Sequence, residues 1–253
     1  MYNNVKYETD LYKEYLMAKV VILSGAGLSA ESGIKTFRDN DGLWEEYDVS
    51  VVCNYDSLEK NESLTLEFYD KRRADIAQKQ PNKAHIEYAK LKKKYSNDIA
   101  IITQNVDDLF EKAGLDKEEV IHLHGYLPEV RCQNPLCEKI YDIGYKSIYD
   151  FHNGFCPKCG SKLRPNIVFF GEAAPLYAKL DQEIQECEFL VVIGTSGYVI
   201  GVNTMANFIE HSILNNLEES PAIEHQLFSK VLFQPATQAV DEIITDIESF
   251  FTK

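Results

Sequence analysis

The sequence lacks any stretch that could cross a membrane, and it lacks an export signal. No apolar run approaches the roughly 18 residues that a membrane-spanning helix needs, and residues 1–15 show no basic region followed by an apolar core. Basic residues are also scarce, with 26 Lys+Arg against 40 Asp+Glu and a formal net charge of −14. Because an acidic chain repels phosphate backbones, we expect no nucleic-acid partner. From the missing span and export signal we expect no membrane association and a cytoplasmic location.

The length and the cysteine content set further bounds. The chain has 253 residues, of which 45% are hydrophobic, enough for the core of one large domain with a small satellite. Four of the six cysteines fall within 28 residues. In a chain without an export signal, such clustering favours metal binding over disulfide bonds. We expect the other two, Cys53 and Cys187, to be ordinary buried or partly buried thiols. No pattern indicates an oligomer, and we take the chain as a monomer.

Short apolar runs, typical of strands covered on both faces, alternate with helix-like stretches. The runs cover residues 20–23, 99–102, 166–170, 189–193 and, more weakly, 212–214, and the helix-like stretches cover 83–95, 106–113, 176–187, 204–210 and 239–251. This alternation predicts an α/β fold in which residues 1–35, 83–125 and 166–253 form a Rossmann-like, doubly wound parallel sheet. Residues 36–82, a helix-leaning insertion, and 126–165, which hold the clustered cysteines, break the alternation and predict a smaller domain.

A glycine-rich turn follows the first apolar run. Gly25, Ala26, Gly27 and Ser29 lie between a predicted strand and a predicted helix start, where backbone N–H groups can receive a phosphate. Gly33 comes six residues after Gly27, so the turn is not the plain G-x-G-x-x-G pattern. Taken alone, the turn is as well explained as a tight connection between a strand and a helix.

Polar residues follow the second apolar run. Gln104, Asn105 and Asp107 come directly after it, and ligands of open α/β sheets bind outside the carboxyl ends of strands. The alternative is a polar cap on the next helix. Further along, His122 and His124 have period-2 spacing, so we expect both rings on one side of a strand. Histidine is suited to proton transfer near neutral pH.

The clustered cysteines have the spacing of a metal site. Cys132 and Cys137 form a C-x4-C pair, and Cys156 and Cys159 form a C-x2-C pair, with 18 residues between the two pairs. Four such thiolates can close a tetrahedral Zn²⁺ site, which leaves no open coordination position and is therefore structural. Disulfides or unmetallated thiols are the alternative.

Together these motifs resemble the sirtuin family, from about residue 19 to about residue 251. The glycine turn continues into Gly33-Ile34-Lys35-Thr36-Phe37-Arg38 and then Gly42-Leu43-Trp44, close to the family signature, although Lys35 stands where the family usually has proline. The resemblance implies an NAD-dependent protein lysine deacylase. It also implies NAD as co-substrate, a structural Zn²⁺ ribbon and acyl-lysine segments of other proteins as partners.

The resemblance also implies a role for each site residue. His124, in the family's His-Gly motif, would be the general base, and His122 a neighbour without an acid–base task. Asn105 and Asp107 would bind the carboxamide and ribose at the nicotinamide end of NAD. The full set implied to border NAD is Gly25, Ala26, Gly27, Ser29, Phe37, Arg38, Gln104, Asn105, Asp107, Gly194, Thr195, Ser196, Asn216 and Glu218. Val168 and Phe169 would lie beside the acyl-lysine, whose peptide adds as a strand; a buried strand without a ligand role is the alternative.

One helix-like segment bears on the acyl group. Tyr69 and Arg72 are three residues apart and would share a helix face. An arginine beside a tyrosine hydroxyl can hold a carboxylate, and this Tyr-x-x-Arg pattern resembles sirtuins that accept succinyl-, malonyl- or glutaryl-lysine. Because Asp70, Lys71 and Arg73 are also charged, a solvated helix face is the alternative.

The reaction implied by the resemblance transfers the acyl group to ADP-ribose. The acyl oxygen attacks C1′ of the nicotinamide ribose as nicotinamide leaves. His124 then takes a proton from a ribose hydroxyl, which attacks the amide carbon. The products are free lysine, nicotinamide and O-acyl-ADP-ribose. A protein ADP-ribosyltransferase or NAD hydrolase, and a non-catalytic NAD-binding sensor, are the alternatives. The presence of His124 argues against the first, because nicotinamide release alone needs no base.

Removal of the metal should inactivate the protein by unfolding the cysteine-bearing segment. Chelation is expected to release one Zn²⁺ per chain and to unfold residues 126–165, since a structural zinc contributes directly to folding. Zinc content, circular dichroism and turnover followed during chelation would check this. Full activity in a zinc-free sample would contradict it.

Overall fold

The structure is a computed structural model of the chain, and it describes residues 18–35, 43–44 and 47–252. Its main element is a six-stranded parallel sheet with the order β11-β10-β9-β1-β4-β5. The strands are β1 (Val20–Ser24), β4 (Ile99–Thr103), β5 (Val120–His122), β9 (Phe189–Ile193), β10 (His211–Asn216) and β11 (Lys230–Phe233). The chain builds outward from β1 in one direction and from β9 in the other, so the strand order reverses between these two neighbours.

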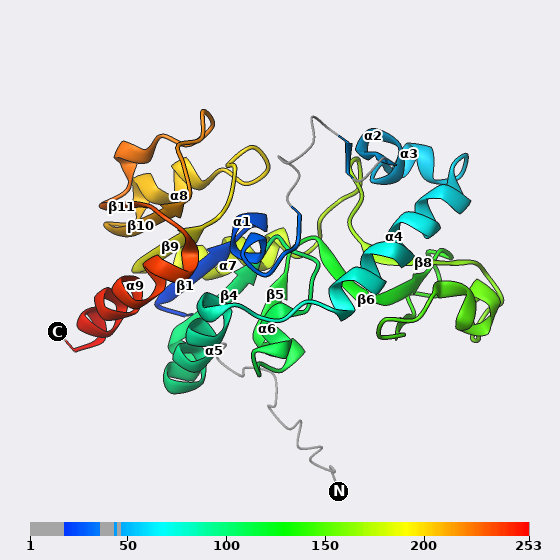
Figure 1. Cartoon of the computed structure of the whole chain (residues 1–253), viewed down its shortest axis with the longest axis horizontal. Coiled ribbons are helices and arrows are strands. Elements are labelled where there is room, and N and C mark those ends of the chain that lie inside the picture. Colours follow the sequence, from blue (N-terminus) through cyan, green and yellow to red (C-terminus); the bar gives the residue numbers. More distant parts are fainter. Residues whose placement is uncertain (1–17, 36–42, 45–46, 253) are drawn as a thin grey trace, which may run out of the picture.

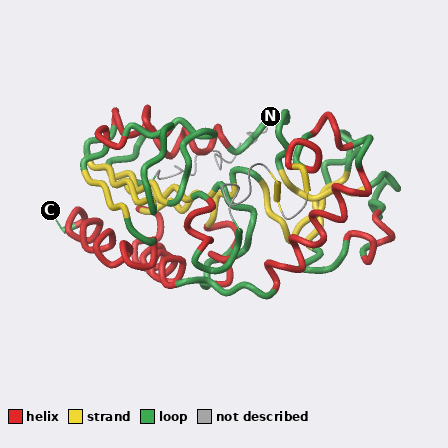
Figure 2. Tube along the Cα trace, turned by 45° about the horizontal axis from the view of Figure 1, so that its top comes forward, coloured by secondary structure: helices red, strands yellow, loops and turns green. Residues whose placement is uncertain are grey.

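Helices cover both faces of this sheet, and the strands form a layer between them (Figure 2). Alternate residues of β1 enter the two cores: Val20 and Ile22 pack with α5 (Lys83–Tyr95) and α9 (Ala236–Phe251). Val21 and Leu23 enter the other core, with residues of α7 (Tyr177–Gln185) and α8 (Val202–Phe208). Each such buried side chain contributes roughly 1.5–3 kcal/mol to folding.

A second group of elements lies beside this sheet (Figure 1). It holds the antiparallel sheet β7-β6-β8 and the long helix α4. Its elements are β2 (Leu43–Trp44), β3 (Tyr47–Asp48), α2 (Val49–Val52), α3 (Tyr55–Leu58), α4 (Glu62–Ala77), β6 (Gly125–Cys132), β7 (Ile140–Asp142) and β8 (Leu163–Ile167). The remaining helices are α1 (Ala26–Ala30), α6 (Leu109–Lys112) and the 3-10 turns Ser96–Asp98, Lys117–Glu119, Ile148–Asp150, His152–Gly154 and His225–Leu227.

The predicted α/β fold with a Rossmann-like parallel sheet is confirmed, but several elements differ from the sequence-based expectation. The run at 166–170 is not a strand of that sheet, because β8 ends at Ile167 and pairs antiparallel with β6. Buried apolar residues alone cannot distinguish these two settings. The predicted helix 106–113 shortens to α6, and the Asp107 carboxylate instead accepts a hydrogen bond from the Leu109 N–H (3.2 Å). Strand β11, only partly buried, was not predicted.

Nowhere in the described part of the chain does a helix combine the length and the apolar character needed to cross a bilayer. The parallel strands take their burial from protein on both faces, as the two cores show.

The loops after β1 and β9 touch through their backbones. The Gly27 N–H donates to the Gly194 carbonyl oxygen (2.8 Å), and Gly194 has a left-handed φ of +61°. A Cβ atom on Gly194 would lie 2.5 Å from the Leu28 nitrogen, closer than any relaxed contact. Only glycine satisfies both requirements, so this position fixes how closely the two loops approach.

Gly194→Ala should therefore destabilise the protein by about 3 kcal/mol, combining the left-handed backbone with a steric clash. Gly144→Ala is the matched control, because Gly144 has a φ of +58° but open space around it. That variant should lose only about 1 kcal/mol. Urea unfolding would measure the free energy of unfolding of both variants. Equal losses of stability would show that the two loops can move apart at no cost in free energy.

Candidate active site

A cavity of about 870 Å³ lies at the carboxyl ends of the parallel strands, where the strand order reverses. The loops after β1, β4, β9 and β10 form one side, and residues 167–170 with part of α4 form another. This is where open α/β sheets bind their ligands.

The cavity gathers almost all predicted binding and catalytic residues. Those that line it are Gly25, Ala26, Gly27, Ser29, Tyr69, Arg72, Gln104, Asn105, Asp107, His124, Val168, Phe169, Gly194, Thr195, Ser196, Asn216 and Glu218. Phe37 and Arg38 lie outside the described residues. Motifs spread over more than 190 positions of the chain thus meet in one place.

A polar network joins the loops that line the cavity. The Asn105 side-chain amide donates to the Gly25 carbonyl oxygen (3.1 Å) and to the Ser29 hydroxyl (2.9 Å). The Ser29 hydroxyl in turn donates to the Asp107 carboxylate (2.9 Å). Burial raises the pKa of the Asp107 carboxyl, and the hydrogen bond from Ser29 opposes that rise. The loop after β4 is therefore fixed to the loop after β1.

His124 presents a free-base nitrogen to the cavity. It lies in the turn after β5, and its Nδ1 lies 2.9 Å from the Gln104 carbonyl oxygen, which can only accept. Nδ1 must therefore carry the proton, and Nε2 keeps its lone pair. Burial lowers the pKa of the His124 imidazole below its usual value near 6.5, so the ring is neutral at pH 7. The Tyr177 hydroxyl, 2.8 Å away, donates to Nε2.

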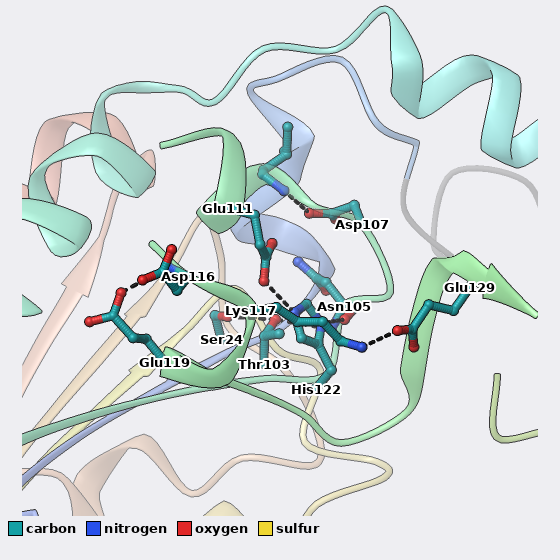
Figure 3. Close-up of polar contacts among 11 residues, drawn as sticks. Ser24, Thr103, Asn105, Asp107, Glu111, Asp116, Lys117, Glu119, His122 and Glu129 are labelled. Carbon is teal, nitrogen blue, oxygen red and sulfur yellow. Dashed lines mark hydrogen bonds and ion pairs between the residues drawn. The ribbon is translucent and has the colours of Figure 1, made fainter. Parts of the chain in front are cut away.

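His122 is bound differently (Figure 3). Its Nδ1 lies 3.1 Å from the Asn105 carbonyl oxygen and its Nε2 lies 2.8 Å from a Glu111 carboxylate oxygen. The expectation of one strand through both histidines is wrong, because β5 ends at His122. The two rings nevertheless hold consecutive carbonyls of one loop, those of Gln104 and Asn105.

Tyr69 and Arg72 line the cavity and are each only 5% exposed. The alternative of a solvated helix face is therefore wrong for these two residues. The Tyr69 hydroxyl lies 3.5 Å from the Cys53 sulfur, and the Tyr69 ring packs edge-on against Phe169 with centroids 5.5 Å apart. Burial raises the pKa of the Cys53 thiol, so it stays protonated and uncharged.

Cys53 and Tyr177 are among the cavity residues that were not predicted. Neither stands in a motif: the one is a lone cysteine and the other begins α7. Only the packing of distant segments brings them to the site, so no local signal could have identified them.

The four clustered cysteine sulfurs all lie within 4.8 Å of one another, and all four thiols are free. The sulfur separations are 3.4 Å for Cys132 and Cys159 and 3.8 Å for Cys137 and Cys156. A tetrahedral Zn²⁺ with bonds of about 2.3 Å places its sulfurs about 3.8 Å apart. The cluster therefore fits a structural zinc ion. Hydrogen bonds with Ser161 lower the pKa of the Cys159 thiol to about 6, whereas burial raises the pKa of the Cys132 and Cys137 thiols, so the fit to zinc rests on the sulfur geometry.

Comparisons with known proteins identify the family of the chain. A model of the Sir2 family matches residues 25–201. An NAD-dependent protein deacylase of Campylobacter jejuni is 49% identical over 235 residues, covering 92% of this chain and 97% of that protein. An NAD-dependent protein deacylase of Helicobacter hepaticus is 44% identical over 260 residues, covering 93% of this chain and 99% of that protein. The crystal structure of a Sir2 homologue in complex with NAD matches with a TM-score of 0.78 and 32% identity, over 93% of this chain and 91% of that one. The chain therefore belongs to the Sir2 family, the sirtuins.

Proposed function

We propose that this sirtuin is an NAD-dependent protein lysine deacylase in which His124 is the general base. The observation that carries the proposal is the lone pair of His124 Nε2, which faces a cavity shared by the Asn105–Asp107 loop and by Tyr69 and Arg72. A proton acceptor thus shares one cavity with a candidate cofactor loop and a candidate acyl pocket.

The cavity suits a dinucleotide because its polar groups are spread along its length. Asn105 and Asp107 would hold the nicotinamide end, and Asn216 with Glu218, at the end of β10, would hold the adenine end. When bound, NAD supplies an electrophilic ribose carbon with nicotinamide as leaving group. The hydrogen bonds of Asn105 to Gly25 and Ser29 hold the loop in place before any ligand arrives.

His124 can act as the base without changing its tautomer. The Gln104 carbonyl keeps the proton on Nδ1, and the low pKa of the buried ring keeps Nε2 unprotonated at neutral pH. Nε2 then accepts a proton from a ribose hydroxyl, and the positive charge that develops is stabilised by the Nδ1–H hydrogen bond. The Tyr177 hydroxyl gives way to that ribose hydroxyl at Nε2.

The segment after β8 is proposed to receive the acyl-lysine peptide as an added strand. Its backbone is already fixed on its inner side: the Val168 N–H donates to the His124 carbonyl oxygen (2.9 Å). The Phe169 N–H donates to the Glu172 carboxylate (2.9 Å), which Arg164 holds in a buried ion pair. Val168 and Phe169 would thereby place the acyl group next to His124.

The acyl group is proposed to include succinyl and malonyl as well as acetyl. Tyr69 and Arg72 are buried residues of the cavity lining, and an acyl carboxylate would reach them from the cavity. A buried guanidinium binds a carboxylate through charge-assisted hydrogen bonds that an acetyl group cannot form.

His124→Ala should lower the kcat/KM for deacylation by about 10²–10⁴-fold, since a general base typically contributes that much. Formation of O-acyl-ADP-ribose from an acyl-lysine peptide and NAD, followed by mass spectrometry, measures this loss. His211→Ala, at an exposed position at the start of β10, is the matched control and should retain activity.

Nicotinamide release measured with and without peptide separates the other possible activities. Release that requires the acyl peptide supports the deacylase. Release without peptide would point to an NAD hydrolase or ADP-ribosyltransferase, and near-normal turnover by His124→Ala would remove His124 from the mechanism.

Arg72→Met should reduce desuccinylation by about 10–100-fold and deacetylation by less than about threefold, because only the succinyl group presents a carboxylate to the guanidinium. Peptides carrying acetyl-, succinyl- and glutaryl-lysine would be compared. Lys71→Met, an exposed cation on the same helix, should change neither rate. Equal losses on acetyl and succinyl peptides would rule out a carboxylate pocket.

A further inference from the structure

The imidazole of His122 is almost completely enclosed, and both of its nitrogens face oxygen atoms. The side chain is 6% exposed and its carboxylate partner Glu111 is 14% exposed. Nδ1 faces the Asn105 carbonyl and Nε2 faces the Glu111 carboxylate, as Figure 3 shows. A carbonyl and an ionised carboxylate can only accept, so this arrangement suits an imidazolium that donates from both nitrogens. In that form His122 and Glu111 make a buried ion pair.

This ion pair connects three segments of the chain. His122 ends β5, Glu111 belongs to the short helix α6, and Asn105 lies in the loop between β4 and α6. The Tyr126 ring packs against the imidazole with centroids 4.8 Å apart, which limits its rotation. The pair thus holds the main chain of the loop at Asn105, while the Asn105 side-chain amide holds the loop to Gly25 and Ser29.

The hydrogen bond from His122 governs the side-chain direction of Asn105. The Asn105 carbonyl is bound by His122, its N–H donates to the Thr103 hydroxyl (3.0 Å), and its amide donates to Gly25 and Ser29. With both peptide groups of the residue held, the backbone position from which the amide reaches Gly25 and Ser29 is fixed. The charge on His122 also acts on Asp107: burial raises the pKa of that carboxyl, and the nearby imidazolium is one of the influences that lower it.

We propose that His122, as an imidazolium paired with Glu111, is a positioning residue for the nicotinamide end of NAD. It acts through the Asn105–Asp107 loop and not by contact with the reacting atoms, since His122 does not line the cavity. The inference rests on the proposed function, because it takes Asn105 and Asp107 as the residues that bind this end of the cofactor.

The test compares binding of NAD with binding of ADP-ribose by calorimetry, without acyl peptide. His122→Gln should weaken NAD by about tenfold, the value of one lost charge-assisted hydrogen bond. It should weaken ADP-ribose, which lacks nicotinamide, by less than about threefold. A general loss of structure would weaken both equally, so the difference between the two ligands is the specific readout.

Two further variants sharpen the test. Glu111→Gln keeps the imidazole and its bond to Asn105 but removes the anion, and should weaken NAD by about threefold. The double variant should bind NAD within about twofold of the affinity of His122→Gln alone, because paired residues act as a unit. Lys117→Gln, which breaks the neighbouring Lys117–Glu129 ion pair in Figure 3, is the control and should bind both ligands normally.

The outcomes are distinct. A folded His122→Gln protein, judged by thermal melting, that binds NAD like the wild type overturns the inference, and so does an equal loss for NAD and ADP-ribose. If His122→Gln does not fold, unchanged NAD binding by Glu111→Gln overturns it. A wild-type protein that binds NAD without deacylating any peptide contradicts the proposed function alone, and one that binds no NAD contradicts both.

Discussion

The direct backbone contact between the loops after β1 and β9 sets the geometry of the whole site. These neighbouring strands are where the order of the parallel sheet reverses, and their loops meet through Gly27 and Gly194 with no side chain between them. The cavity opens directly above this contact. The loop after β4 then joins them through the Gln104 amide, which donates to the Thr195 hydroxyl (3.1 Å). Residues that would bind the two ends of a dinucleotide thus share one rigid base.

The second group of elements depends on the cysteine cluster for its order and reaches the site through two strands. β6 begins at Gly125, immediately after His124, and runs to Cys132, a candidate zinc ligand. β8 returns from the cluster to Ile167, next to Val168 and Phe169. A metal held by the cysteines, outside the cavity lining, can therefore stabilise the substrate segment through β6 and β8 without taking part in the chemistry.

The sequence allowed prediction of those site residues that belong to motifs of closely spaced residues. The glycine turn, Gln104 to Asp107, His124 and the four cysteines all follow from residues close together in the chain, and the structure brings them to the expected places. The pairing of β8 and the positions of Cys53 and Tyr177 arise from packing between distant segments, which periodicity cannot encode. The roles of all the site residues, Phe37 and Arg38 included, and the two-domain division of the chain remain predictions.

The tautomer of the candidate base is specified by main chain and not by a side chain. His124 donates its Nδ1 proton to the carbonyl of residue 104, and every amino acid carries that carbonyl. Exchange of the Gln104 side chain would leave this acceptor in place. A substitution at position 104 therefore leaves the proton on Nδ1 of His124. Only a movement of the backbone carbonyl could move that proton to Nε2.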